Sequence, residues 1–357
     1  MLNRAVEADT KLAVAWARLS EAYWLRYQET RRETFREEAR RALAKALLLA
    51  PGLPVVQYTR GRGLLVEKKY QEAKEVLEQV VAKTPGMDLA WANLGPVYRE
   101  LGDYGKARHA VETAIDLNPE YFRHRVYLGL LLYKFGEFDR SAAAYQKATE
   151  LNRASFSAWN GLATTYLAMH RFLDAETAST QSIRIDENAT GFSNLGTVYY
   201  YENRLEDAVT NYTRATELDP GAADTWGNLG DALTMLKRDK DARAAYGRAV
   251  EAARLEAERV PTDPRAHIML GLYCARARDR ECASGERDRA ANMQPASLEI
   301  LFRSAVVYSI FGETEKALDR LEKAVKLGLS KSEIANHPDL IPLHGNPRYQ
   351  KILDMAS

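Results

Sequence analysis

The sequence has little of several features that mark common classes of protein. It contains only two cysteines, Cys274 and Cys282, among 357 residues. Two cysteines are too few for a disulfide framework, and their spacing is not that of a zinc site. We therefore expect both to be reduced residues packed inside a cytoplasmic protein. No apolar run approaches the length that spans a membrane, and the first residues lack the regions of a signal peptide.

An excess of charge of either sign is also missing. The chain has 50 basic and 49 acidic residues, a balance that argues against nucleic acid as the partner. Strings that hold phosphates or dinucleotides, and those of protein kinases, do not occur. None of the six histidines pairs at metalloprotease spacing. We expect no catalytic residue, no metal site and no cofactor.

What the sequence does contain is a small residue that returns every 34 positions, the signature of a stacked repeat. The series is Gly61, Gly95, Gly129 and Ala163, then, after a slip of one, Gly196 and Gly230. A second series with the same period is Ala73, Ala107, Ser141, Ala175, Ala208 and Ala242. We expect two helices to approach closely where Gly95 faces Ala107, with room for nothing larger than a methyl group.

Each repeat is predicted to consist of two helices. The run from Trp91 to Tyr98 places its large side chains on one stripe of a first helix, helix A, and it recurs at 159–166 and 226–233. The run from Ala107 to Ala114 does the same for a second helix, helix B. Pro119 follows where helix B must stop.

These residues resemble the tetratricopeptide repeat (TPR) family, whose Trp, Leu-Gly, Tyr, Ala, aromatic, Ala and Pro positions are matched in order. The resemblance covers nearly the whole chain. It implies an all-α fold, a right-handed superhelical solenoid of about nine helix-turn-helix units with a C-terminal capping helix. The expected repeats are 13–51, 54–85, 88–119, 122–153, 156–187, 189–220, 223–260, 264–295 and 298–329.

Three repeats depart from the regular pattern. The first and seventh are longer by seven residues, about two helical turns, so a lengthened helix keeps its apolar stripe on nearly the same face. We expect Arg26 to Glu38 to extend the first helix or its turn, and Glu251 to Val260 to prolong helix B of the seventh repeat. In the eighth repeat Arg287 takes the aromatic position of helix B and Gly285 lies inside that helix. We expect that helix to be short or mobile.

We expect the chain to begin inside a repeat, because residues 1–12 align with the end of a helix B whose helix A is missing. One interpretation is a natural half-repeat that caps the array. The other is that the chain is a piece of a longer polypeptide, which we favour because terminal repeats are normally modified to be polar.

The opposite end, residues 330–357, is predicted to be a cap. It reads as an extended Pro-rich segment followed by a short amphipathic helix, with Tyr349, Ile352 and Leu353 available to cover the last repeat. This segment resembles the end of TPR arrays attached to bacterial eukaryotic-like serine/threonine protein kinases. Similar tails close arrays behind bacterial transcription regulators and nucleotide cyclases. His344 stands where those tails more often have Arg. The resemblance to the kinase arrays in particular is therefore weaker than the resemblance to this wider group of bacterial arrays.

If the helix pairs stack as TPR pairs do, positions 2, 5, 6, 9, 12 and 13 of each repeat point into a concave groove. Asn93, Asn194 and Asn228 share position 6, where an amide can donate to and accept from an extended peptide backbone. The alternative is an amide that is only solvated. The other peptide-binding candidates are Arg99, Tyr127, Tyr133, Lys134, Thr164, Thr197, Tyr200, Tyr201 and Asp231. The tyrosines would be binding anchors, or side chains half-buried between repeats.

Two other ligand sites are not favoured. Trp16, Trp91, Trp159 and Trp226 share position 4, where we expect them to pack between helix pairs rather than form a ligand box. The pattern that captures chaperone carboxyl termini needs Lys and Asn in one repeat and basic residues two repeats later. No three consecutive repeats supply it.

The sequence therefore predicts a non-enzymatic cytoplasmic scaffold that binds an extended peptide or partner segment in its concave groove. It would be the C-terminal docking or sensing region of a larger bacterial signalling protein, with any kinase or other catalytic domain outside this chain. The partner would be a protein or peptide, with no nucleic acid and no membrane. The alternative is a self-association module, a homodimer that brings attached catalytic domains together.

Overall fold

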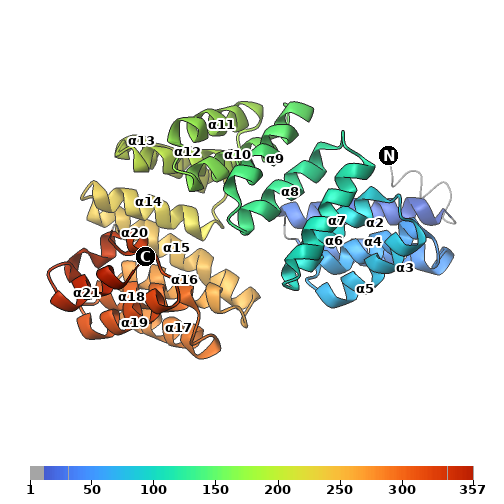
Figure 1. Ribbon diagram of the computed structural model, residues 1–357. Helices are drawn as coiled ribbons and strands as arrows, with labels where there is room; N and C mark the ends of the chain where they lie inside the picture. Colours follow the sequence, from blue (N-terminus) through green and yellow to red (C-terminus); the bar gives the residue numbers. More distant parts are fainter. Residues whose placement is uncertain (1–11, 31, 336, 357) are drawn as a thin grey trace. The chain divides into compact units, whose positions relative to one another are not determined.

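The computed structural model describes residues 12–30, 32–335 and 337–356. Throughout these ranges the chain consists of helices and short turns with no β-strand, which confirms the all-α expectation (Figure 1). The predicted truncated helix at residues 1–12 lies, apart from Leu12, outside the described residues. The chain forms two compact units, Met1–Ile185 and Asp186–Ser357.

The N-terminal unit contains five helix pairs, each made of helix A and helix B of one repeat. Within this unit, each helix A also contacts the helix A of the neighbouring repeat. The pairs are α2 (Ala13–Thr30) and α3 (Glu33–Leu49), α4 (Pro54–Val66) and α5 (Tyr70–Lys83), α6 (Asp88–Glu100) and α7 (Tyr104–Leu117), α8 (Phe122–Lys134) and α9 (Phe138–Leu151), and α10 (Phe156–Ala168) and α11 (Phe172–Ile185).

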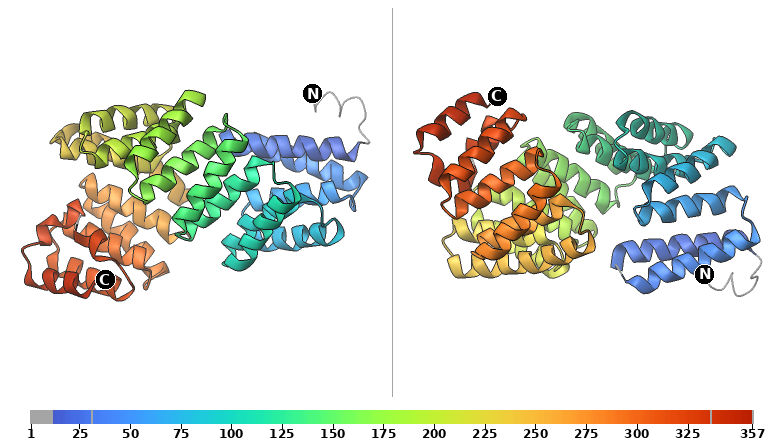
Figure 2. Two further views of the ribbon diagram at one scale, coloured as in Figure 1. Left: turned by 45° about the horizontal axis from the view of Figure 1, so that its top comes forward. Right: turned by 90° about the horizontal axis from the view of Figure 1, so that it is seen from below.

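The C-terminal unit contains four further pairs and the cap. Figure 2 shows the cap helices beside the last pair from two further sides. The elements are α12 (Ala189–Tyr201) and α13 (Leu205–Leu218), α14 (Ala223–Met235) and α15 (Asp239–Arg259), α16 (Pro264–Arg276) and α17 (Arg280–Met293), α18 (Leu298–Ile310) and α19 (Thr314–Lys326), then α20 (Lys331–Ala335), the 3-10 helix η1 (Pro338–Leu343) and α21 (Pro347–Met355).

The small residue at position 8 of helix A allows the two helices of a repeat to approach closely. A Cβ atom on Gly129 would lie 2.7 Å from the ring of Tyr145 in the paired helix, too close for any side chain. The predicted close approach is confirmed, but the crowding neighbour is a large side chain of helix B. At Gly95 that neighbour is Val111, and Ala107 contributes its carbonyl oxygen at 3.6 Å.

The turn between helix A and helix B has the same backbone conformation from the second repeat to the ninth. In each of these turns one residue adopts a positive φ: Lys68, Gly102, Gly136, His170, Asn203, Lys237, Arg278 and Gly312. For a residue with a Cβ atom this conformation costs about 1 kcal/mol. The packed helices on either side therefore set the turn, whichever residue occupies it.

The two long repeats accommodate their extra residues as predicted. Helices α2 and α3 have 18 and 17 residues, against 13 and 14 for the regular pair α6 and α7. Helix α15 has 21 residues, and its added turns bury Ala252, Ala253 and Ala257. An insertion of two turns thus keeps the apolar stripe in the core.

The prediction of a short helix B in the eighth repeat is wrong, because α17 has 14 residues like its regular counterparts. The guanidinium carbon of Arg287 lies 4.0 Å from the centre of the Tyr308 ring in α18, so a cation–π contact replaces aromatic packing. At this position the backbone of helix B itself lies close to helix A. A Cβ atom on Gly271 would lie 3.1 Å from the backbone nitrogen of Arg287 and 3.2 Å from the carbonyl oxygen of Ala283.

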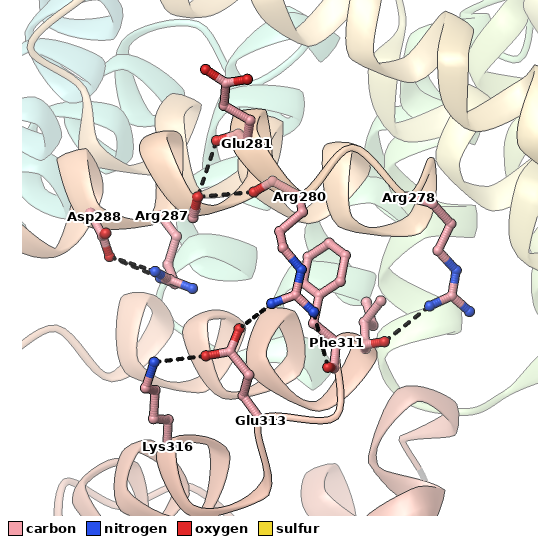
Figure 3. Close-up of polar contacts among 10 residues, drawn as sticks. Arg278, Arg280, Glu281, Arg287, Asp288, Phe311, Glu313 and Lys316 are labelled. Atoms are coloured by element: carbon pink, nitrogen blue, oxygen red, sulfur yellow. Dashed lines mark hydrogen bonds and ion pairs between the residues drawn. The ribbon is translucent and has the colours of Figure 1, made fainter.

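Arg278 in the turn between α16 and α17, and Arg280 at the start of α17, tie the eighth repeat to the ninth (Figure 3). Arg278 donates to the carbonyl oxygen of Ile310 at 3.0 Å. Arg280 donates to the carbonyl oxygen of Phe311 at 3.2 Å and pairs with Glu313 at 2.9 Å. These bonds hold the start of α17 against the end of α18 and the turn that follows it.

Cys274 of α16 and Cys282 of α17 form a disulfide, with an S–S distance of 2.00 Å and Cα atoms 5.8 Å apart. The expectation of two reduced thiols is therefore wrong. The pairing arises because a short turn places the end of helix A beside the start of helix B, which the spacing alone did not indicate. Disulfides persist mainly in oxidising compartments, so the bridge does not fit the expected cytoplasmic location.

The segment after α19 covers the last repeat. It was expected to be extended before its final helix, but the structure folds it into α20 and η1, with Pro338 at the first position of η1, where proline suits a helix start. In α21 the residues Tyr349, Ile352 and Leu353 are all buried. Arg348 pairs with Asp319 at 2.6 Å and holds α21 against α19. The capping helix of the expected fold is thus present.

Candidate functional site

The large residue at position 4 of the repeat has a structural role. The indole N–H of Trp91 donates to the carbonyl oxygen of Pro85 at 2.9 Å, in the turn before α6. The same bond, to the carbonyl oxygen six residues earlier, is made by Trp159, Trp226, Gln57 and His267. This supports the interpretation that these tryptophans join successive repeats and do not form a ligand box.

The three asparagines at position 6 are not equivalent. Nδ2 of Asn93 donates to the carbonyl oxygen of Leu89 at 2.7 Å and to the hydroxyl of Tyr58 at 3.4 Å. Both amide hydrogens are therefore used internally, and only Oδ1 remains for a ligand. Asn194 is also buried, whereas Asn228 is half-buried. Asn93 lies in the N-terminal unit and the other two in the C-terminal unit.

A network of charged and polar side chains joins α2 to α4 on their helix-A faces. Glu21 accepts a hydrogen bond from Thr59 at 2.8 Å and pairs with Arg18 at 3.0 Å and with Arg62 at 3.8 Å. The side chains of Glu21 and Arg62 are 11% and 18% exposed. Two arginines thus share one carboxylate at the edge of the core.

Tyr58 continues this network towards α6 and α8. Burial raises the pKa of Tyr58 to about 12, Glu21 and Tyr127 add to the shift, and Arg62 opposes it. Tyr127 therefore lies within electrostatic reach of Tyr58, whose hydroxyl also accepts from Asn93. We call these side chains the Tyr58 row: Arg18, Glu21, Tyr58, Thr59, Arg62, Asn93 and Tyr127.

The Tyr58 row leads to a cavity of about 440 Å³, which we call the Tyr127 cavity. Its lining consists of Phe122, Arg123, Val126, Tyr127, Asn152, Ala154, Ser155, Phe156 and Ser157. Tyr127 and Phe156 are 37% and 40% exposed, so two aromatic rings are open to solvent. Such rings at the wall of a cavity are typical anchors for a bound side chain.

In the C-terminal unit a buried arginine joins the helix-A face to the cap. Nη1 of Arg276 lies 2.8 Å from Oδ1 of Asp231 in α14, and Nη2 lies 2.9 Å from Oδ2 of Asp339 in η1. Tyr246 donates to Asp231 at 2.7 Å. Burial raises the pKa of Asp231, while Arg276 and the bond from Tyr246 lower it. We call Asp231, Arg276 and Asp339 the Arg276 triad.

Three predicted residues of α12 lie around the Arg276 triad. Burial raises the pKa of Tyr200 to about 12, with Asp231 adding to the shift and Arg276 opposing it. The ring of Tyr201 packs against that of Tyr200 at 5.8 Å and is 58% exposed. Thr197 accepts a hydrogen bond from Tyr212 at 3.0 Å, and Asp231 contributes to the raised pKa of Tyr212.

The cap occupies part of this helix-A face. Ser309 at the end of α18 donates to the carbonyl oxygen of Asp339 at 2.5 Å, and Leu340 is fully buried. A cavity of about 340 Å³ remains between η1 and the repeats, with Arg243 and Arg278 among its lining residues.

Sequence reasoning missed Arg276 and Asp339. Arg276 occupies position 13 of its repeat, a groove position, so the repeat register could have identified it as a candidate. Asp339 lies outside the repeats, and nothing in the sequence pattern indicated it.

The remaining candidates lie elsewhere. Nε of Arg99 donates to Glu100 at 2.9 Å, and the ring of Tyr133 packs against that of Phe138 at 5.4 Å. Lys134 is exposed and Thr164 is half-buried. The contacts of Arg99 and Tyr133 are made outside the Tyr58 row.

The chemistry of these faces is that of recognition. They present aromatic rings, hydroxyls, an amide oxygen and arginines, which suit a polypeptide. Within the part of the chain that the structure describes, no group of three His, Cys, Asp or Glu side chains could hold a metal ion. In the same part, every helix is too short or too polar to cross a lipid bilayer.

Comparison with known families identifies the repeats. Residues 92–155, 128–186 and 193–257 match the model of a tetratricopeptide repeat family. The chain therefore contains tetratricopeptide repeats. No curated protein matches the chain.

Solved structures with the same kind of fold include the APC/C hetero-tetramer Cut9-Hcn1. The match is 16% identical, covers 83% of this chain and has a TM-score of 0.57. This chain spans 55% of that one.

Two smaller proteins also match, with lower TM-scores. YrrB, described as a TPR protein with an unusual peptide-binding site, is 25% identical over 55% of this chain and 97% of its own, with a TM-score of 0.36. TTC0263, a thermophilic TPR protein of Thermus thermophilus, is 19% identical over 51% of this chain and 100% of its own, with a TM-score of 0.44. The repeat fold itself is that of a protein-interaction scaffold, typically without catalysis.

Proposed function

We propose that this chain is a non-enzymatic scaffold that binds an extended peptide or partner segment on the helix-A faces of its repeats. The observation that carries the proposal is the meeting of the Tyr58 row with the Tyr127 cavity in the N-terminal unit. Predicted groove residues from α6 and α8 join there with a cavity whose size falls within the range of roughly 300–1,000 Å³ typical of ligand sites.

The two parts of this surface have different roles in binding. The cavity accepts one large apolar side chain, whose burial contributes about 1.5–3 kcal/mol. The Tyr58 row offers Oδ1 of Asn93 as an acceptor and arginine N–H groups as donors for a peptide that lies along it. A pre-formed row of this kind lowers the entropic cost of ordering the protein side of the interface.

The proposal is tested with a random twelve-residue peptide library displayed on phage and selected against the full chain. We expect recurrent sequences with a large apolar residue, and synthetic copies that bind with micromolar affinity or better in fluorescence anisotropy. Tyr127→Ala should weaken them at least tenfold, whereas Tyr104→Ala, an exposed ring on α7, should not. A library that yields no enriched sequence would contradict the proposal.

We also propose that the scaffold is the C-terminal docking or sensing region of a larger bacterial signalling protein. The support is the resemblance of residues 330–357 to the tails of such arrays. The disulfide bears on where that protein works, because a bridge persists in an oxidising compartment and is reduced in the cytoplasm. Alkylation of free thiols in intact cells, followed by mass measurement of Cys274 and Cys282, decides between the two locations.

A further inference from the structure

We infer that the segment bound by the N-terminal unit is an acidic peptide with a large apolar residue. Its apolar side chain enters the Tyr127 cavity, and neighbouring aspartates or glutamates pair with Arg123 and with the arginines of the Tyr58 row. This inference rests on the proposed function and names the chemistry of its partner.

The lining of the Tyr127 cavity explains why the peptide needs a large apolar residue. Phe122, Val126, Tyr127 and Phe156 supply its apolar lining, and the exposed rings of Tyr127 and Phe156 lose contact with water when a side chain enters. Its other lining residues are small or polar and come largely from the turn before α10. An aliphatic or aromatic side chain therefore gains more here than a charged one, whose desolvation would not be repaid.

Arg123 favours an acidic residue next to the apolar residue of the peptide. Its side chain is exposed and lines the cavity, and its guanidinium lies 5.8 Å from the ring centre of Phe122. Among the described residues, no carboxylate lies within ion-pair distance of it. A cation held over a ring at the edge of an apolar cavity is ready to bind a carboxylate in the bidentate geometry that arginine favours.

The Tyr58 row adds a second positive region. Arg18 and Arg62 share the single carboxylate of Glu21, which also accepts from Thr59. The contact of Arg62 is long, 3.8 Å, and Arg18 is 45% exposed. Both guanidinium groups therefore keep N–H donors for another carboxylate. Together with Arg123, three arginines on this face have one carboxylate between them.

The same observations favour a peptide over nucleic acid. The whole chain carries a formal charge of only +1, whereas nucleic-acid binding relies on a broad basic surface. Arg123, moreover, borders a cavity whose wall is largely apolar. A single anchored side chain with flanking carboxylates matches this pattern.

The test uses three synthetic peptides with one central phenylalanine, flanked by glutamate, serine or lysine, and fluorescence anisotropy with the full chain. We expect the glutamate peptide to bind at least tenfold more tightly than the lysine peptide, with affinity that falls as salt rises. Arg123→Glu should weaken the glutamate peptide at least tenfold. The matched control, Arg184→Glu on the exposed end of α11, should change its affinity less than twofold.

Each contrary outcome has a distinct meaning. If enriched library peptides are not acidic, or if the two charge reversals act equally, the inference is wrong and the proposed function stands. If no peptide is enriched at all, both are wrong. A single-stranded oligonucleotide that displaces the glutamate peptide at lower concentration than the unlabelled peptide would replace the inference with nucleic-acid binding.

Discussion

The two units use the same repeat but treat their helix-A faces differently. In the N-terminal unit the Tyr58 row and the Tyr127 cavity are lined by repeat residues alone, and two rings remain open to solvent. In the C-terminal unit the corresponding face holds η1 of the chain's own cap, and Arg276 binds Asp339 there. In our proposal the first face binds a partner, while part of the second is already occupied by a carboxylate of the same chain.

The two units also hold their groove arginines in different environments. Arg276 is 13% exposed, and although burial alone would lower its pKa, the two carboxylates that hold it raise that pKa. Arg123 is exposed and rests on an aromatic ring. Arg276 holds the cap against the repeats through Asp339. In our proposal, Arg123 instead contacts a bound peptide.

Arg276→Ala is expected to have the largest effect on the C-terminal unit. The change leaves Asp231 and Asp339 facing each other without a cation, so we expect the free energy of unfolding of the C-terminal unit to fall by about 3–5 kcal/mol. Urea denaturation followed by circular dichroism measures the loss, and hydrogen exchange locates it in α14, α16 and η1. The control Arg123→Ala should stay within about 0.5 kcal/mol. A loss below about 1 kcal/mol would mean that apolar contacts alone hold the cap.

Removing the disulfide tests how much this bridge contributes to the stability of the C-terminal unit. The bridge joins residues eight apart, and loop closure of that size corresponds to about 2–3 kcal/mol. We expect Cys274→Ala combined with Cys282→Ala, or reduction of the native chain, to lower the free energy of unfolding in urea by that amount. Peptide binding by the N-terminal unit should not change. If reductant still destabilises the double variant, the effect does not come from this bridge.

Acid should loosen the cap. Burial lowers the pKa of His337 to about 4, with Asp339 opposing the shift and Arg276 and Arg303 adding to it. The unfolded chain takes up a proton near pH 6.5 and the folded cap does not, so stability is lost as the pH falls from 6.5 through 4. We expect a loss on the order of 2 kcal/mol, read from hydrogen exchange of α20 and η1.

The matched variant for this pH effect is His337→Gln, which cannot titrate. It should flatten the dependence of cap exchange on pH between 6.5 and 4. A variant that keeps the full dependence would assign it to another group.

Much of the fold could be predicted because the same contacts recur at the same positions of each repeat. Gly95 and Gly129 stand at one register position, and each meets a large side chain of the paired helix. Position 4 also repeats its contact, so Trp91 could be assigned a structural role before its bond to Pro85 was known. The seven-residue extension of α15 followed from helical geometry alone.

What could not be predicted depends on contacts outside the repeat register. Arg276 and Asp339 are 63 residues apart, and their pairing needs the path of the cap, which no periodicity describes. The disulfide was missed because cysteine count was weighed without the hairpin geometry that brings Cys274 to Cys282. Helix α17 was judged by propensity, although the ring of Tyr308 that receives Arg287 supports it from the next repeat.

The candidate site was predicted in part for the same reason. Register placed Asn93 and Tyr127 on the helix-A face. In the structure Asn93 donates to the hydroxyl of Tyr58, and Tyr127 adds to the raised pKa of Tyr58. Register did not reveal that the amide hydrogens of Asn93 are used internally, or that Phe156 completes a cavity with Tyr127. Those facts depend on side-chain directions in three helices at once.

The bond from position 4 to the preceding turn has a consequence for how such arrays diversify. An indole, a carboxamide and an imidazole all reach the same carbonyl oxygen, six residues upstream. Because three chemically different side chains make this bond, it requires only an N–H donor at the right distance from that carbonyl oxygen. Sequence drift can therefore erase the tryptophan that makes a repeat easy to recognise while the connection between neighbouring repeats survives.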